Sequence, residues 1–437
     1  MGKIKNIVIS LTVALCIGSL FSFAYAAQKI TIWQQYEPVP EIMQSFNDMY
    51  KEAEKKLNIE IQTVYIPQAE MHQKLLTSIA AGTYPDIVFW FGQPGIEFSR
   101  LGIICQVNDV VEEAGKEKWP ERILKALQYP IGTQREIPFL SRLEGLHLWK
   151  DWFTKAGIDP EPRKDAKGNY HVWAIDTWEK LVNTAQKLNQ DTNGDGKIDK
   201  WGFGAQYCRK AIGDGSDWAF ALLTSYGASI GDTDKKKITF DSPEAVKAVQ
   251  LMKDIYWKYK IVPPGVTAWD EYANNLYFQN KTVAMVINGN SIVPRLLKEN
   301  PDVVPQVGMS IPPAGPATRG AIAIPMTWTI FKTKNADISK KLVLYSLNKD
   351  IQLQLLKKMG KTGFYGPMRL DVLTDPYFEE LPMTIRMCME FAKYEVGPAY
   401  PYPTTPEARV AYSSGIFVDI LVRITVDNWS AEKAVKE

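Results

Sequence analysis

The sequence predicts an α/β fold in which strands alternate with helices. Three observations predict it: the first region alternates strand-like and helix-like segments, its third strand-like segment is almost wholly apolar, and 437 residues suffice for two ordinary domains. A strand that is apolar on both faces is typical of a parallel sheet covered by helices on both sides. Because the order is strand, helix, strand, helix, strand, we expect right-handed crossovers between neighbouring strands.

Each segment of this first region carries its own signal. The two early strand-like segments end in polar residues or alternate in hydrophobicity, and the helix-like segments repeat apolar residues every three to four positions. Gly82 is expected to close the second helix, since glycine accepts the left-handed backbone found there. In order, the segments are strand 29–36, helix 40–57, strand 59–66, helix 70–82 and strand 85–91.

The rest of the chain continues the pattern with clear helix starts. Thr177 is expected to cap one helix, and Ser242 another, with Pro243 in its first turn. Strand-like segments cover 136–150 and 281–289, two short helical patterns cover 338–360, and two more helices are expected within 413–437.

The N-terminus resembles a cleavable export signal. Lys3 and Lys5 precede an apolar run over 7–23, and Ala24-Tyr25-Ala26 is a cleavage site of small residues, so we expect a periplasmic or otherwise exported protein that starts at Ala27. The bulky Leu15 before Cys16 argues against a lipid anchor, and no second apolar run is long enough to span a membrane.

Charge and composition exclude several function classes. Loss of Lys3 and Lys5 brings the 51 basic residues level with the 49 acidic ones, which argues against a nucleic-acid binder. The three cysteines of the exported chain are widely spaced and allow one disulfide at most, and the three histidines lack zinc-ligand spacing.

Six motifs in order give the sequence a family resemblance. They are KLLTSIAAGTYPDIVFW (74–90), LHLWKDWFTKAGIDP (146–160), TWEKLVNTAQKL (177–188), FDSPEAVKAVQLMKDIY (240–256), FQNKTVAMVINGN (278–290) and GFYGPMRLDV (363–372). Together they resemble the extracellular solute-binding proteins of ABC importers, the sugar-binding group typified by maltose-binding protein. Leu148 and Trp149 depart from the Tyr-Asn pair that is frequent in that family.

The resemblance implies a two-lobed periplasmic-binding-protein fold, type II-like, with a mainly parallel sheet flanked by helices in each lobe and a ligand cleft between the lobes. It implies a signal peptide over 1–26, a first lobe from 27–142 and 306–347, and a second lobe from 143–305 and 348–437. We expect a monomer that binds a small solute and permease subunits, requires no cofactor, and is not an enzyme.

Ligands of open α/β sheets bind beyond the carboxyl ends of the strands, so strand-end residues are the first site candidates. A pyranose presents an apolar face to aromatic rings and a rim of hydroxyls to amides, carboxylates and arginines. Residues chosen by strand-end position, by an aromatic–polar pairing or by a family motif are Trp33, Gln35, Tyr36, Glu37, Trp90, Gln93, Arg142, Asp217, Trp218, Trp269, Asp270, Gly289, Asn290, Trp328, Tyr365 and Arg369. Trp178, Trp201 and Trp257 are assigned to the core instead.

Two alternatives to sugar binding stay open. Arg142 and Arg369 suit an anionic ligand such as a sugar phosphate or glycerol phosphate, or an interlobe salt bridge, and polyamines or peptides are further candidates. A secreted carbohydrate hydrolase would need two carboxylates flanking the scissile bond. Glu37, Asp217 and Asp270 are available, but no spacing selects a pair and no nucleophile or metalloprotease motif occurs.

The segment DTNGDGKIDKWG (191–202) resembles a calcium loop. Ligands would come from Asp191, Asn193, Asp195, the Lys197 carbonyl and Asp199. Gly202 stands where the bidentate glutamate of such loops belongs, and the alternative is an Asx-rich turn after a helix. We therefore expect a loop that could hold a structural calcium ion.

Overall fold

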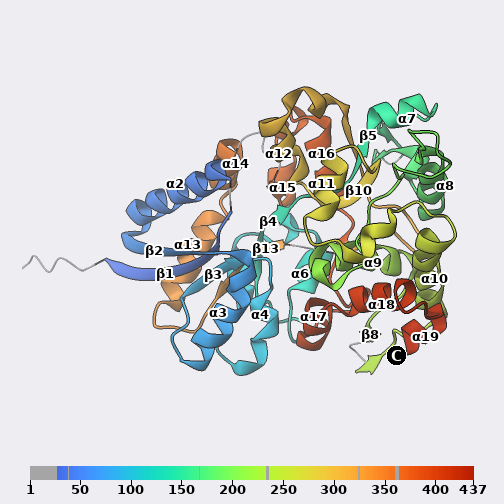
Figure 1. The fold of residues 1–437 in the computed structure, drawn as a ribbon. Helices are drawn as coiled ribbons and strands as arrows, with labels where there is room; N and C mark the ends of the chain where they lie inside the picture. The colour runs from blue at the N-terminus through green and yellow to red at the C-terminus, as the bar shows by residue number, and fades with distance from the viewer. Residues whose placement is uncertain (1–26, 38, 167, 233–235, 323–324, 360–363) are drawn as a thin grey trace, which may run out of the picture.

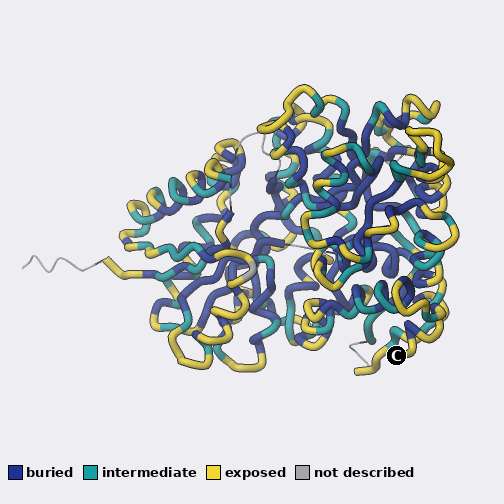
Figure 2. Tube along the Cα trace, in the orientation of Figure 1, coloured by how far each residue is buried: buried dark blue, intermediate teal, exposed yellow. Residues whose placement is uncertain are grey.

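The computed structural model describes residues 27–37, 39–166, 168–232, 236–322, 325–359 and 364–437. The chain forms two α/β lobes side by side, with its first strands in one lobe and its last helices in the other (Figure 1). The buried parts of the trace gather inside each lobe, and the exposed parts follow the outer helices and loops (Figure 2). The predicted signal segment 1–26 lies outside the described residues.

The first lobe is built on a six-stranded sheet in the order β14-β4-β13-β3-β1-β2. Helices α2, α13 and α14 cover one face over the larger apolar core, and α3 lies on the other face over a smaller one (Figure 1). The strands are β1 (Gln28–Gln35), β2 (Ile59–Ile66), β3 (Ile87–Trp90), β4 (Ile137–Arg142), β13 (Pro325–Ile330) and β14 (Tyr365–Pro367). The helices of this region are α2 (Pro40–Leu57), α3 (Gln68–Ala80), α4 (Pro94–Glu97), α5 (Asn108–Glu113), α6 (Glu121–Ala126), α13 (Ala336–Ser346), α14 (Lys349–Met359) and α15 (Leu370–Leu373).

The second lobe has a smaller sheet, β10-β5-β11, surrounded by helices. Its strands are β5 (Glu144–Trp149), β10 (Met285–Gly289) and β11 (Val307–Ser310), and a short parallel pair joins β12 (Ala321–Ile322) to β15 (Glu395–Val396). Its helices are α7 (Lys150–Lys155), α8 (Trp178–Leu188), α9 (Ile212–Tyr226), α10 (Pro243–Trp257), α11 (Ala273–Gln279), α12 (Ile292–Glu299), α17 (Pro406–Ser413), α18 (Ile416–Thr425) and α19 (Ala431–Lys436). Helix α16 (Met383–Ala392) packs against β5 and β11.

The chain makes its first crossing from one lobe to the other at a single residue. Leu143 alone separates β4 of the first sheet from β5 of the second. Its N–H donates to the Phe364 carbonyl (3.2 Å), and its own carbonyl accepts from Asn290 N–H (2.7 Å). The segment 136–150, which the sequence presents as one strand, is therefore two strands in two sheets.

The expected parallel pairing holds only for part of the fold. β1 pairs in parallel with β2 and β3, as the alternation of strands and helices predicts. The other three pairings of the first sheet and both pairings of the second are antiparallel, so the first sheet is mixed and the second is antiparallel rather than mainly parallel. β13 and β14 enter from later crossings between lobes, which no local pattern reveals.

Strand pairing also divides the chain differently from the expected boundaries. β11, expected in the first lobe, pairs with β5 of the second. α14 and β14, expected in the second lobe, belong to the first: β14 pairs with β4, and α14 packs on α2.

Helix ends follow the sequence closely. The Thr177 hydroxyl accepts from Lys180 N–H, and the Ser242 hydroxyl accepts from Ala245 N–H (3.2 Å each). Gly82, with φ of 66°, follows the end of α3. Trp257 was assigned wrongly to the core, since it is 46% exposed and its indole N–H reaches the Ile424 carbonyl.

Two further features concern the whole described chain. Cys105, Cys208 and Cys388 are all free thiols. A search of the described helices finds none with the length and apolarity needed to cross a bilayer.

Candidate interlobe binding site

The end of β1 places two polar side chains at the carboxyl edge of the first sheet, where a tyrosine of β14 joins them. Gln35 and Glu37 are 2% and 4% exposed, although both carry strongly polar groups. Glu37 accepts hydrogen bonds from the Gln35 amide (2.6 Å) and from the Tyr365 hydroxyl on β14 (2.5 Å). The other amide atom, Gln35 Oε1, is buried without a hydrogen-bond partner. β1 and β14 lie apart in the sheet, so this edge gathers residues from distant parts of the chain.

Arg142, at the end of β4, reaches from the first lobe to the second. Its guanidinium donates to Gln68 at the start of α3 (3.4 Å) and lies 5.6 Å from the centre of the Phe364 ring. A Cβ added at Gly289, at the end of β10, would lie 3.7 Å from Arg142 Nε, which is ordinary van der Waals contact. The guanidinium therefore lies beside the second lobe.

In the second lobe, amide side chains surround Asp214, which lies in the first turn of α9. Asp214 Oδ2 accepts from Asn274 (2.9 Å), Asn288 (2.8 Å) and Gln206 (3.4 Å). Asn288 also contacts Asn275, whose own amide donates to Ser291 (3.1 Å). The amides that bond Asp214 come from three different segments, which meet where β10 ends.

We call Gln35, Glu37, Arg142, Glu144, Asp214, Asp217 and Tyr365 the interlobe cluster. Burial raises the pKa of Glu37. Burial and then the nearby Asp217 charge raise the pKa of Glu144 well above its usual range. Burial and then the Glu271 charge raise the pKa of Asp214 to about 6. Burial, followed by the charge of Asp214, also raises the pKa of Asp217. Arg142 lowers the pKa of all four carboxyls, so one arginine serves four acids.

Helix α17 connects the two lobes beside this cluster. Tyr412 donates to Asp217 on α9, and its ring packs edge-on against Phe417 of α18. Three residues earlier, Arg409 donates to the carbonyl of Gly92, which follows β3 in the first lobe (3.3 Å). A short helix thus touches the strand-end region of both lobes.

The turn after β3 holds a second group of incompletely bonded residues. Gln93 is 1% exposed, has a left-handed backbone with φ of 53°, and neither of its amide atoms has a partner. Two residues on, Gly95 N–H donates to Glu136 Oε1 (2.6 Å), and the other carboxyl oxygen of Glu136 is unpaired. Burial raises the pKa of Glu136 to about 7. Trp90 packs with His72 and Phe98, yet its indole N–H is also unsatisfied.

Two of the predicted aromatic contacts are core residues instead. Trp218 is 1% exposed within the second-lobe core and donates its indole N–H to the Gln206 carbonyl (3.0 Å). Trp328 lies between Phe89 and Phe139 in the first-lobe core. The sequence places both beside polar residues, but neighbours along a helix or strand point to different faces.

The hydrogen bonds of Arg369 are made to residues of its own lobe. It makes two bonds to the Asp371 carboxylate (2.9 and 2.6 Å) and one to the Leu347 carbonyl (2.6 Å). Its guanidinium also lies 5.2 Å from the centre of the Trp119 ring. This corrects its prediction as a ligand contact.

The remaining predicted residues lie in or near the same region with mixed exposure. Trp269 is 5% exposed beside Tyr277 with an unsatisfied indole N–H, whereas Asp270 is exposed. Asn290 is buried next to the crossing residue Leu143, Trp33 is half-buried, and Tyr36 is 49% exposed.

The calcium-like loop satisfies its first acid internally. Asp191 accepts from the N–H groups of Gly194, Asp195 and Gly196, as in an Asx-type turn. Asn193 and Asp195 accept further backbone bonds. No group of three or more His, Cys, Asp or Glu side chains suited to a metal is found among the described residues. Calcium in this loop stays a prediction.

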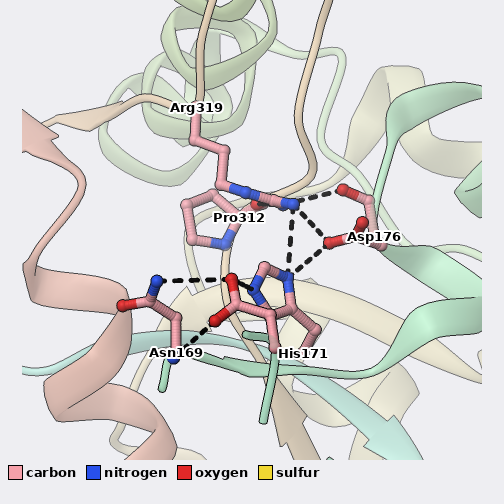
Figure 3. Close-up of polar contacts among 6 residues, drawn as sticks. Asn169, His171, Asp176, Pro312 and Arg319 are labelled. Atoms are coloured by element: carbon pink, nitrogen blue, oxygen red, sulfur yellow. Dashed lines mark hydrogen bonds and ion pairs between the residues drawn. The ribbon is translucent and has the colours of Figure 1, made fainter. Parts of the chain in front are cut away.

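One network of polar side chains in the second lobe pairs its charged groups with one another (Figure 3). His171 contacts Asp176 through Nδ1 (2.7 Å) and Asp165 through Nε2 (3.0 Å). Arg319 pairs with the Asp176 carboxylate and donates to the carbonyls of Asp176 (2.7 Å) and Pro312 (2.8 Å). We call Asp165, His171, Asp176 and Arg319 the His171 clasp, which fastens residues 312–319 to β7 (Tyr170–His171).

Sequence reasoning did not select five of the polar residues around the interlobe cluster. They are Gln206, Asp214, Asn274, Asn275 and Glu395. The Asn-Asn pair and the first-turn acid of a helix were visible in the sequence, but nothing local shows that they face β10.

A family model described as bacterial extracellular solute-binding protein matches residues 48–383. YcjN of Escherichia coli K12, provisionally named an ABC transporter periplasmic-binding protein, is 23% identical over 291 residues. That match covers 66% of this chain and 61% of YcjN, so the matched region spans less than two thirds of the relative.

Solved structures share the fold over almost the whole chain. A solute-binding protein of Thermotoga lettingae TMO bound to α-D-tagatose has a TM-score of 0.71 and 21% identity, covering 94% of this chain and 97% of its own. Maltose-bound T. maritima MalE3 has a TM-score of 0.70 and 22% identity, with the same coverage. The similarity confirms the two-lobed periplasmic-binding-protein fold.

Proposed function

Because the chain belongs to the bacterial extracellular solute-binding protein family, we propose that it captures a carbohydrate between its lobes and delivers it to the permease of an ABC importer. The proposal includes export from the cytoplasm, closure of the lobes about the crossing at Leu143, and binding without catalysis. Sugar-bound proteins of the same fold and the provisional transport role of YcjN support it.

The observation that carries the proposal is the meeting of polar strand ends from both lobes. Gln35 and Glu37 come from the first lobe, Asp214 and Asn288 from the second, and Arg142 of the first lobe lies beside Gly289 of the second. Buried polar groups are nearly always hydrogen-bonded, so the bare Gln35 oxygen and the Gln93 amide favour a ligand rich in hydroxyls as the missing partner. Contacts made to both lobes at once would favour the closed arrangement.

An anionic ligand is less well supported. Arg369 is bonded to Asp371, and the remaining arginine of the cluster, Arg142, stands among four carboxyl groups. A sugar phosphate would add negative charge to a region where acids already outnumber cations.

A thermal-shift screen of mono- and oligosaccharides, polyols and sugar phosphates tests the proposal. A bound sugar at about 100 times its dissociation constant should add roughly 2.7 kcal/mol to the free energy of unfolding. The variant Gln35→Met should lose most of this shift, whereas Gln44→Met, on the exposed face of α2, should keep it. Absence of any sugar-dependent shift would contradict sugar binding, and release of reducing sugar from a glycoside would show a hydrolase instead.

A further inference from the structure

Helix α17 joins the two lobes at a place where the chain itself does not cross between them. The end of α17 belongs to the second lobe, because Tyr412 lies in the apolar core of that lobe and its hydroxyl donates to Asp217 of α9. The start of α17 faces the first lobe, where it packs against α4 at the lower junction of the lobes (Figure 1). Since α18 and α19 continue in the second lobe, this bridge consists of noncovalent contacts.

Two side chains in the first turn of α17 reach the first lobe. Arg409 is 7% exposed, and its Nε donates to the carbonyl of Gly92 in the turn after β3 (3.3 Å). Glu407 forms an ion pair with Arg100, which follows α4 and also donates to the Tyr129 hydroxyl of its own lobe (2.9 Å). The pair is open to solvent, with side chains that are 56% and 61% exposed. The bridge thus combines one buried hydrogen bond with one exposed ion pair.

These contacts lie beside the candidate binding site. The turn that Arg409 holds is the turn that carries Gln93, whose two amide atoms have no partner. At the other end of α17, the tyrosine bond goes to Asp217 of the interlobe cluster. The bridge therefore lies on the same side of the crossing at Leu143 as the candidate site, and opening of the lobes about that crossing would separate α17 from the first lobe.

The bridge is strong enough to favour closed lobes and too weak to lock them. Domains of one chain move relative to each other unless their interface is large and apolar. A hydrogen bond from a charged donor, such as the one from Arg409 to Gly92, shifts an equilibrium by about tenfold. An exposed ion pair such as Arg100–Glu407 adds less and is screened by salt. Closed and open lobes can therefore coexist in the unliganded protein.

We propose that α17 is an interlobe latch, which keeps part of the unliganded protein closed through Arg409 and Glu407. A ligand that contacts both lobes then closes the remainder. The apparent affinity for such a ligand is proportional to the fraction of protein that is already closed, so the latch raises affinity for whatever solute binds between the lobes. The inference rests on the lobe movement of the proposed function, and it does not depend on the identity of the ligand.

Small-angle X-ray scattering of the unliganded exported chain tests the latch without any ligand. Arg409→Met removes the donor to Gly92 and keeps an unbranched side chain in the same place. We expect the ratio of open to closed protein to rise about tenfold, and the radius of gyration to exceed that of the unsubstituted protein. An unchanged radius of gyration in a folded Arg409→Met protein would overturn the proposal.

A charge swap at the exposed ion pair gives a second test that does not disturb a buried residue. Arg100→Glu places two carboxylates opposite each other and should also increase the radius of gyration of the unliganded protein. The double variant Arg100→Glu/Glu407→Arg restores an ion pair and should return the radius to its original value. Asp159→Ala breaks an exposed arginine pair within the second lobe and is the matched control, for which we expect no change. A radius that the double variant fails to restore would contradict the latch.

The outcomes separate the latch from the proposed function. Failure of both scattering tests removes the latch and leaves sugar binding intact, because no sugar is present in either. A larger radius of gyration in Arg409→Met supports the latch even if the thermal-shift screen contradicts sugar binding. With a sugar that the screen identifies, Arg409→Met should bind up to about tenfold more weakly than the unsubstituted protein, whereas Asp159→Ala should bind equally. Equal affinity in an Arg409→Met protein of increased radius would overturn the link between the latch and affinity.

Discussion

The interlobe cluster and the His171 clasp are built from the same kinds of side chain but differ in how completely those side chains are bonded. Both combine a partly buried arginine with acidic side chains that distant segments contribute. In the clasp, both ring nitrogens of His171 meet carboxylates, and Arg319 reaches a carboxylate and two carbonyls. In the interlobe cluster, Arg142 forms no direct ion pair within the described chain, and Gln35 keeps an unbonded oxygen.

The difference shows how a structural network is told from a binding surface. A complete network stabilises the fold, because removal of one member leaves buried charges unpaired. An incomplete network destabilises the unliganded fold slightly and favours whatever completes it. The two regions should therefore respond in opposite ways to substitution.

The largest effect is expected from the clasp. Arg319→Ala removes the direct cationic partner of Asp176 and one donor from each of two carbonyls, and we expect a loss of about 3–5 kcal/mol in the free energy of unfolding. Denaturant titration measures it. Arg163→Ala removes an exposed pair with Asp159 on the same lobe and should cost less than about 1 kcal/mol. Equal losses in both variants would remove the distinction between clasp and surface.

The second effect is the pH dependence of stability that buried acids without a directly bonded cation produce. Burial raises the pKa of Glu395 to about 8, and its carboxylate accepts only from Ser141 among the described residues. The folded protein then binds more protons than the unfolded chain between about pH 4.5 and pH 8, so stability falls as pH rises through this window. Glu395→Gln mimics the neutral acid and should flatten the decrease by up to about 1.4 kcal/mol per pH unit.

Thermal unfolding between pH 5 and pH 8 measures this slope for both proteins. Glu113→Gln, exposed on α5, should keep the slope of the unsubstituted protein. A slope that Glu395→Gln leaves unchanged would show that this carboxyl is ionised in the folded state throughout the window.

A pair of glutamines gives the third and sharpest comparison. Gln93→Met removes two unbonded amide atoms at constant length, and we expect the unliganded protein to gain up to about 1 kcal/mol while ligand affinity falls. Gln134 is equally buried, but its amide bonds the carbonyls of Leu127 and Glu136 (3.4 and 2.8 Å). Gln134→Met should therefore destabilise the protein by about 1–3 kcal/mol. The opposite signs are read from chemical denaturation, and a gain for both would contradict the account.

The smallest effect is expected at the loop of residues 191–199. If calcium binds, millimolar calcium should raise the melting temperature by a few degrees, because a ligand that prefers the folded state stabilises it. Asp191→Asn should abolish that rise. A melting temperature that neither calcium nor chelator changes would identify the loop as an Asx-rich turn only.

The sequence predicted the positions of helices and strands better than the faces to which their side chains point. Periodicity and capping residues located β1 to β3, α8 and α10, because these signals are local. Strand-end position selected Gln35 and Glu37, whereas Arg142 came from the crossing segment and Tyr365 from a family motif, and the structure places all four in one region. Their contact with a ligand stays a prediction. Trp218 and Trp328 were wrong because an aromatic beside a polar residue does not reveal which face it occupies.

The rest depends on long-range pairing that no local pattern encodes. β14 and β11 lie in lobes opposite to those expected, since the chain crosses between the lobes more often than its composition shows. Asp214 was missed because its partners on α11 and β10 lie about 60 and 74 positions away along the chain.

Small-angle X-ray scattering tests the central claim most directly, that the interlobe cluster is completed by a solute which brings the lobes together. The exported chain is measured without ligand and with a saturating amount of the sugar that the thermal-shift screen identifies. The account predicts a smaller radius of gyration with the sugar, and Gln93→Met, measured at the same sugar concentration, should show less of that change. Tight binding with an unchanged radius of gyration would contradict it.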